Sequence, residues 1–152
     1  KLATLAQARR SSYFFFFQLP WLPERSLTRH RAGFLKRMLR RDPAAPGAFA
    51  PEEIEAYREA FLQPGAATAT VNYYRAAFRS GTRIPGLRRS LEKVPTLVLW
   101  GEGDRYLGPE LLDGLDELVP DLRLVRIPNA SHWLPADAAD LVNAELVSFF
   151  GR

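Results

Sequence analysis

The chain has 152 residues, of which 47% are hydrophobic and 25% charged, and its formal net charge is +4. This size and composition are those of a globular domain with its own core, and they exclude a disordered chain. The chain contains no cysteine, which excludes disulfides and thiolate metal sites and leaves the redox compartment open. A reducing compartment is allowed, and we expect the cytoplasm.

The charge is distributed unevenly along the chain. Residues 1–95 carry 17 basic and 7 acidic side chains, whereas residues 96–152 carry 4 and 10. Two parts with different surfaces are therefore expected. The apolar stretch "YFFFFQLP" is far shorter than the about 20 residues that cross a bilayer, so we expect no stable membrane insertion.

The first part predicts helices separated by proline and glycine. Apolar residues recur at helical spacing in residues 26–41, 51–65 and 71–81. The clusters "RRDPAAPGAFAP" and "TRIPGLRRS" divide these helices from one another and from the C-terminal part of the chain. We predict an entry segment over residues 1–17, a helical subdomain over residues 18–90 and a sheet-forming part over residues 91–152.

The second part alternates strands and helices. The run "VPTLVLWG", residues 94–101, is typical of a strand buried on both faces of a parallel sheet, and "LRLVRI", residues 122–127, predicts a second strand. Between them, residues 109–120 place their leucines on one helical face, and residues 136–150 predict a terminal amphipathic helix. This order predicts an α/β fold with parallel strands and covering helices.

Two titratable residues come after the two predicted strands. Asp104 stands in the turn of "LVLWGEGD", and His132 stands in the loop "RIPNASHWLP". The carboxyl ends of parallel strands meet at one edge of a sheet, where reactive groups of α/β proteins lie. Taken singly, each residue has a plainer interpretation, as a turn aspartate and a hydrogen-bonded loop histidine. Together they favour a catalytic base oriented by an acid.

Two aromatic stretches in the first part carry tyrosines. One is "YFFFFQLP", which begins at Tyr13, and the other is "NYYRA", which contains Tyr74. A tyrosine hydroxyl can donate a hydrogen bond to an oxygen that gains negative charge during a reaction. Aromatic core packing with a satisfied hydroxyl is the alternative for each of them.

Taken together, these motifs resemble the α/β-hydrolase superfamily, and within it the epoxide hydrolases. "PTLVLWGEGD" is similar to the family's strand and acid-bearing turn, and "RIPNASHWLP" is similar to its histidine loop. The two aromatic stretches are similar to the cap segments that each supply one tyrosine. The resemblance covers nearly the whole chain and implies the C-terminal part of an α/β-hydrolase fold, with a helical cap subdomain followed by the last parallel strands and helices of the core sheet.

The resemblance also implies a chemistry. An aspartate nucleophile outside the chain forms a covalent ester with an epoxide carbon, and His132, oriented by Asp104, activates the water that releases a diol. Tyr13 and Tyr74 bond to the epoxide oxygen. The substrate is a small apolar epoxide, and neither a metal nor an organic cofactor is implied. The residues expected to line the substrate pocket are Phe17, Trp21 and Trp133.

One feature of the family is missing from the sequence. The chain contains no glycine-x-serine-x-glycine or glycine-x-aspartate-x-glycine elbow and no oxyanion loop. Because the chain also begins with Lys1 inside structured-looking sequence, we expect a fragment of a longer protein that carries the nucleophile upstream. A haloacetate or haloalkane dehalogenase, or an esterase-like enzyme, is the alternative within the superfamily.

A non-catalytic interaction module is the alternative outside it. Residues 25–41 are rich in arginine and lysine and could bind phosphate or an anionic membrane surface. They lack the interleaved aromatics of a single-stranded nucleic-acid site, so we expect a solvated basic helix face and no nucleic-acid partner. The sequence leaves the oligomeric state open.

Overall fold

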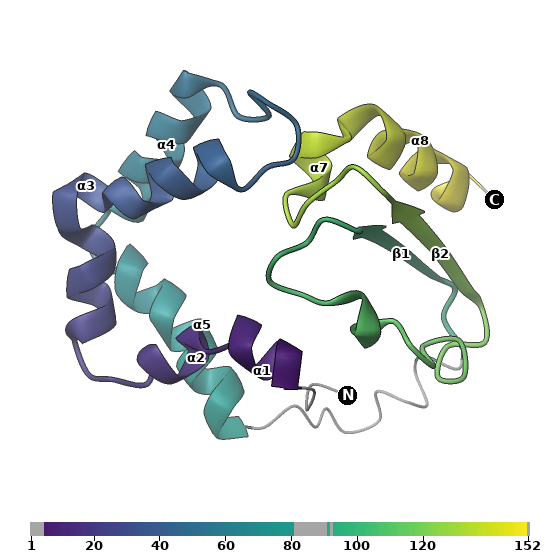
Figure 1. Ribbon diagram of the computed structural model, residues 1–152, viewed down its shortest axis with the longest axis horizontal. Helices are drawn as coiled ribbons and strands as arrows, with labels where there is room; N and C mark the ends of the chain where they lie inside the picture. The colour runs from purple at the N-terminus through teal and green to yellow at the C-terminus, as the bar shows by residue number, and fades with distance from the viewer. Residues whose placement is uncertain (1–4, 81–90, 92, 152) are drawn as a thin grey trace.

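The helices of residues 5–80 lie on one side of the molecule, and the two strands lie on the other, together with the helices of residues 134–150 (Figure 1). The structure, a computed structural model, describes residues 5–80, 91 and 93–151. Figure 1 shows the loops after β1 and β2 extending from the strands toward the helical side. The elements in chain order are α1 (Leu5–Arg10), α2 (Tyr13–Phe16), α3 (Leu22–Arg41), α4 (Pro51–Phe61), α5 (Ala66–Ser80), β1 (Thr96–Gly101), the 3₁₀ helix η1 (Pro109–Leu111), β2 (Leu122–Ile127), α7 (Leu134–Asp137) and α8 (Ala139–Phe150).

Helix α3 is bent in its middle. It begins at Leu22, before the predicted start at residue 26, and carries Pro23 in its first turn, where a missing N–H is tolerated. Residues 29–32 leave the helical conformation, and Ala32, with a φ of 53°, is fully buried at the bend. The two halves of α3 therefore run in different directions (Figure 1).

Helices α4 and α5 confirm the two further helices predicted in the first part. Pro51 begins α4, and the backbone N–H of Ala50 donates a hydrogen bond of 2.7 Å to the carboxylate of Glu53, which caps the helix. Gly65, with a φ of 84°, separates α4 from α5. Helix α5 then starts at residue 66, five positions before the predicted residue 71.

The two strands pair in parallel, as predicted. The register aligns Thr96 with Leu122 and Gly101 with Ile127, so both strands end at the same level. The core below this end is a cluster of buried apolar residues from β2, the loop after it, α7 and α8, namely Ile127, Ala130, Leu134 and Val142. The first strand is less buried than predicted, because Thr96 to Trp100 are only partly covered and β1 has one partner strand in the described part of the chain.

The prediction of a helix over residues 109–120 is wrong. Only the short η1 forms, and the chain continues in turns to β2. Gly114 lies at a φ of 68°, a left-handed conformation that a right-handed helix cannot contain. Leu112 and Val119 are buried all the same, so the segment packs its apolar residues as an irregular connection.

The predicted terminal helix is divided in two. Ala138, at φ −142° and ψ 49°, separates α7 from α8. Val142 is buried, as the predicted apolar face requires, whereas Leu141 and Leu146 are 42% and 37% exposed.

The connection between the helical part and β1 includes the cluster "TRIPGLRRS", which lies outside the described residues, so the predicted subdomain boundary near residue 91 stays a prediction. None of the described helices is long and apolar enough to cross a membrane.

Candidate active site

Asp104 and His132 meet at the carboxyl ends of the two strands. His132 Nδ1 lies 2.9 Å from Asp104 Oδ2. The parallel register explains this contact, because each residue comes after its own strand at the same edge of the sheet. The side chain of Asp104 is 9% exposed and that of His132 is 41% exposed. The acid is thus sheltered, while the imidazole is open to water and to a reactant.

The second oxygen of Asp104 fixes the turn that carries it. Asp104 Oδ1 accepts hydrogen bonds from the backbone N–H groups of Tyr106 and Leu107, at 2.7 and 2.9 Å. This is the local bonding of a turn aspartate, and it occurs together with the contact to His132. The two interpretations of Asp104 offered by the sequence are therefore compatible, since one oxygen shapes the turn and the other faces the imidazole.

The two loops also touch each other through their backbones. Gly103 N–H donates to the carbonyl of Ala130 at 2.9 Å, and Glu102 N–H donates to that of Ile127 at 3.0 Å. A Cβ atom on Gly101 would lie 2.4 Å from the carbonyl oxygen of Ser131, so only glycine permits this approach. The loop that carries the histidine is thereby held directly against the end of β1.

The two candidate tyrosines lie side by side, although 61 positions separate them in the sequence. The ring centroids of Tyr13 and Tyr74 are 5.7 Å apart in an edge-on arrangement. Burial raises the pKa of Tyr13 above its ordinary value, and the neighbouring Tyr74 and the carboxylate of Asp104 raise it further. Tyr13 therefore stays protonated near neutral pH and can act as a hydrogen-bond donor.

The three residues predicted to line the substrate pocket lie in different places. Phe17 packs on Tyr74, with ring centroids 4.9 Å apart. Trp133 lies beside the base, with its ring 5.8 Å from that of His132. Trp21, which directly precedes α3, is 69% exposed. It takes no part in the ring contacts of Phe17 with Tyr74 or of Trp133 with His132.

A cavity of about 550 Å³ opens beside His132. Its walls come from α3, α4, the connection between them, the histidine loop, α7 and the start of α8, and they are largely apolar. Phe49 forms an edge-on contact with Trp133, with centroids 5.6 Å apart. Residues that line the cavity and that the sequence did not single out are Leu35, Leu39, Phe49 and Tyr57. A cavity of this size and character suits a small apolar molecule.

Five polar residues near the pair were not singled out from the sequence. Tyr106 packs its ring 5.0 Å from that of His132 and donates its hydroxyl hydrogen to Asp42. Gln7, fully buried, binds the carbonyl of Tyr106 at 2.9 Å, and Asp137 accepts hydrogen bonds from Ser131. Only Gln7 could have been noticed in the sequence, because it is a polar residue in a run of apolar and small residues. The others became recognisable only when distant segments were brought together.

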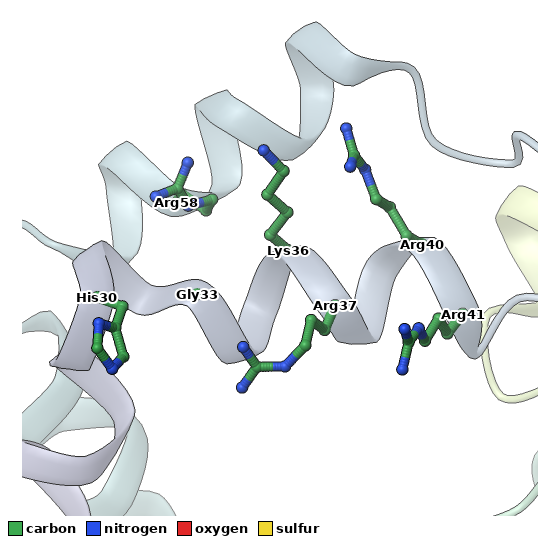
Figure 2. A pocket seen from close by; sticks show the side chains of 7 residues that line it. All are labelled: His30, Gly33, Lys36, Arg37, Arg40, Arg41 and Arg58. Atoms are coloured by element: carbon green, nitrogen blue, oxygen red, sulfur yellow. The ribbon is translucent and has the colours of Figure 1, made fainter.

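The basic residues of α3 form a separate surface. A concavity of about 510 Å³ is lined by His30 and by arginine and lysine side chains of α3 and α4. In Figure 2, Lys36 and Arg40 extend toward α4, whereas Arg37 and Arg41 extend from the opposite edge of α3. The cations diverge rather than converge on one point, which is the arrangement of a solvated helix face.

Metal binding has no corresponding cluster of side chains. Within residues 5–80, 91 and 93–151, no three His, Asp or Glu side chains lie together in a way that could hold a metal ion.

The chain is similar to known proteins over almost its whole length. A family profile described as the alpha/beta hydrolase fold matches residues 13–139. Human epoxide hydrolase 4 is 35% identical over 149 residues, which cover 95% of this chain and 40% of the human protein. Epoxide hydrolase 3 of Mus musculus is 38% identical over 134 residues, covering 86% of this chain and 35% of the mouse protein.

A solved structure gives the same fold. The epoxide hydrolase of Bacillus megaterium in complex with an inhibitor superposes with a TM-score of 0.79 at 23% identity, and the match covers 99% of this chain and 54% of that structure. The chain thus spans about 40% of the human relative and about half of the solved structure. These matches confirm the resemblance predicted from the sequence, and the chain belongs to the alpha/beta hydrolase fold family.

Proposed function

We propose that the protein containing this chain is an epoxide hydrolase, in which these residues supply the base, its orienting acid and two hydrogen-bond donors. Two observations carry the proposal: the Tyr13–Tyr74 pair, with ring centroids 5.7 Å apart, and a histidine bonded to an acid at 2.9 Å. The carboxylate of that acid, Asp104, helps to raise the pKa of Tyr13. The names of the human and mouse relatives support the same activity.

The first step opens the epoxide ring. A carboxylate from outside residues 1–152 attacks an epoxide carbon, the carbon–oxygen bond of the ring breaks, and its electron pair stays on the oxygen. Tyr13 and Tyr74 donate hydrogen bonds to that oxygen as it becomes negative. A proton from solvent water then completes the hydroxyl, and the solvent regains a proton when the attacking carboxylate is restored in the second step. Because the pKa of Tyr13 is raised, its hydroxyl is present as a donor throughout the neutral range.

The second step releases the product. His132 removes a proton from water, and the resulting hydroxide attacks the ester carbonyl, which frees the diol and restores the carboxylate. The imidazole becomes positively charged in this step, and the carboxylate of Asp104, bonded to Nδ1, stabilises it. The exposure of His132 allows water to reach the other ring nitrogen, Nε2.

The substrate is a small apolar epoxide in the cytoplasm. The cavity beside His132 has largely apolar and aromatic walls, and Phe17 and Trp133 add aromatic surface near the tyrosines and the base. A largely apolar site of this kind favours an aliphatic or aryl substituent on the epoxide over a charged one.

Trapping of the ester tests the proposal. In the full-length protein, His132→Gln removes the base of the second step and leaves the first step intact, so incubation with styrene oxide should leave a covalent adduct detectable by mass spectrometry. Absence of an adduct in this variant, with the wild type producing diol, would rule out the covalent route.

The tyrosines are tested with the same substrate. The double variant Tyr13→Phe with Tyr74→Phe should lose diol formation by at least about 100-fold, the usual consequence of removing donors to a developing oxyanion. Unchanged diol formation would remove both tyrosines from the mechanism. Turnover of a haloalkane but not of styrene oxide would identify a dehalogenase instead.

A further inference from the structure

The connection between α3 and α4 is bonded to both loops of the proposed catalytic pair. Asp42, at the end of α3, accepts a hydrogen bond from the hydroxyl of Tyr106. The backbone N–H of Ala45, three residues later, donates to the carboxylate of Asp137 at 2.9 Å. Tyr106 belongs to the loop of Asp104, and Asp137 lies five residues after His132. Residues 42–45 therefore join the loop after β1, through Tyr106, to the end of α7, which follows the histidine loop after β2.

The hydrogen bond between Asp42 and Tyr106 helps to hold Asp104 in place, because Tyr106 is also bonded to Asp104. The backbone N–H of Tyr106 donates to Asp104 Oδ1 at 2.7 Å, and its ring packs 5.0 Å from the ring of His132. The side-chain amide of the fully buried Gln7 donates a hydrogen bond of 2.9 Å to the carbonyl of the same residue, Tyr106. With backbone and hydroxyl both bonded, Tyr106 has little freedom to move relative to the acid.

The hydrogen bond between Ala45 and Asp137 helps to hold His132 in place, because Asp137 is also bonded to Ser131, the residue before His132. Asp137 Oδ2 accepts from the backbone N–H and from the hydroxyl of Ser131, at 2.7 and 2.5 Å, and Ser131 immediately precedes His132. The other oxygen, Oδ1, is the one that accepts from Ala45. One carboxylate thus spans the residue before the base and the connection between α3 and α4.

The protonation states of Asp137 and Tyr106 favour strong hydrogen bonds at both contacts. Burial tends to raise the pKa of Asp137, but the hydrogen bonds from Ala45 and Ser131 outweigh it and lower the pKa. The pKa of Tyr106 is raised by burial and by its bond to Asp42. Near neutral pH the aspartate is therefore ionised and the tyrosine protonated, and hydrogen bonds to a charged acceptor are stronger than neutral ones.

We propose that residues 42–45 hold the Asp104–His132 pair in alignment, with Tyr106 and Asp137 as positioning residues that transmit this constraint from the helical part of the molecule. The proposal rests on the function proposed above for the pair. It assigns a role in the hydrolysis of the ester, the step in which His132 acts, and none in the opening of the ring.

A double-mutant cycle in the full-length enzyme tests the acid side. Tyr106→Phe keeps the ring and removes the hydroxyl, and Asp42→Ala removes the acceptor. Each should slow hydrolysis of the ester about 10-fold in single-turnover experiments with styrene oxide, since small misplacements of a catalytic group have effects of this order or larger. The double variant should be no slower than either single variant, because both remove the same link. The rate of ester formation should stay within about twofold of the wild type.

Conservative variants separate positioning from a general loss of structure. Asp42→Asn retains an oxygen acceptor for Tyr106 and should restore hydrolysis to near the wild-type rate. On the base side, Asp137→Asn should slow hydrolysis, because an amide has one acceptor oxygen and cannot accept the bonds from both Ser131 and Ala45. Asp140→Asn, at the exposed start of α8, is the matched control and should have no effect, and Tyr73→Phe, at a side chain that is 76% exposed, is the control for Tyr106.

The outcomes distinguish this proposal from the proposed function. Additive effects of Tyr106→Phe and Asp42→Ala, equal slowing of both chemical steps, or failure of Asp42→Asn to rescue would overturn the positioning role. If the wild type forms no ester, the proposed function fails, and the NMR signal of the His132 Nδ1 proton then decides the positioning role alone. That proton should exchange with water faster in Tyr106→Phe and Asp137→Asn than in the wild type, and unchanged exchange would refute the link.

Discussion

At the scale of single residues, His132 and Asp104 differ in exposure, and this difference suits a base oriented by an acid. The carboxylate is sheltered at 9% exposure, whereas the imidazole is 41% exposed. A buried carboxylate interacts more strongly with a neighbouring charge than one in water, because the surrounding medium screens it less. The acid can therefore orient the base and stabilise its charge while the base still reaches water.

A second charged contact, between Arg75 and Glu24, holds the tyrosine-bearing segments together. Arg75 Nη1 lies 2.6 Å from Glu24 Oε1, and the side chains are 13% and 18% exposed. The same guanidinium donates to the carbonyl of Phe17 at 2.9 Å and to that of Leu19 at 2.6 Å. Arg75 thus fastens the turn between α2 and α3 to α5, next to Tyr74.

This contact predicts a pH dependence of stability. The hydrogen bond from Arg75 lowers the pKa of Glu24 and outweighs the opposing effect of burial. A lowered folded-state pKa adds stability above the unfolded pKa of about 4.3 and loses it as the pH falls through the folded value. At pH 7, Glu24→Gln should therefore reduce the free energy of unfolding of the full-length protein by about 1 kcal/mol, measured by urea denaturation. This loss should shrink as the pH falls below about 4.

Glu59→Gln, at an exposed position of α4, serves as the matched control. It should leave the free energy of unfolding within about 0.5 kcal/mol of the wild type across the same pH range. A loss in Glu24→Gln that is the same at pH 3 and pH 7 would contradict the ionic origin of the contact.

At the scale of elements, apolar spacing predicted most helices and both strands but not where backbone conformation interrupts them. Residues 109–120 have the leucine spacing of a helix, yet Gly114 adopts a φ of 68° and the segment forms turns. The bend in α3 at residues 29–32 is likewise invisible in the apolar pattern. Periodicity reports which side chains are buried, whereas these breaks depend on how the segment must run to reach the next element.

The end of β1 lies so close to the histidine loop that adding one methyl group at Gly101 should destabilise the protein. In Gly101→Ala the new Cβ would lie 2.4 Å from the carbonyl oxygen of Ser131 and 2.5 Å from that of Ala130. Backbone atoms cannot rotate aside as a side chain can, so the histidine loop must move. Unfolding experiments on the full-length protein should show a loss of about 1–3 kcal/mol, and ester hydrolysis should slow because His132 leaves its position.

Gly33→Ala provides the matched control for this substitution. Its Cβ would lie 3.5 Å from His30 Cβ and 3.7 Å from an Arg37 nitrogen, which are ordinary contacts. Stability should stay within about 0.5 kcal/mol or increase slightly, because alanine favours a helix over glycine. Equal losses in the two variants would show that the close approach at Gly101 is unimportant.

At the scale of the whole molecule, the helical side and the strand side are joined by polar contacts around the proposed site. These contacts are Gln7 with Tyr106, Tyr106 with Asp42, and Ala45 with Asp137. Each connects residues at least 64 positions apart in the sequence. These bonds therefore join the two sides and also contact the segments that carry Asp104 and His132.

The apolar surface predicts weak cooperativity for the 152-residue chain by itself. Val147 and Phe150 of α8 are 74% and 76% exposed, and the described residues form a sheet of two strands. A two-stranded sheet is marginally stable without further strands or helices that cover it. We expect the isolated chain to bind a hydrophobic dye and to melt without a sharp transition in near-ultraviolet circular dichroism. A single sharp transition for the isolated chain would contradict this expectation.

The sequence by itself predicted both strands, most of the longer helices, the fold family and the candidate residues Asp104, His132, Tyr13 and Tyr74, because apolar spacing and short motifs are local properties. It did not identify Tyr106, Asp42 or Asp137 as partners of the pair, since each is an ordinary turn or helix-end residue in its own segment. The tertiary structure decided which loops meet at the end of the parallel strands and which part of the helical side is bonded to them. Such contacts join residues far apart in the chain and depend on the packing of the whole molecule.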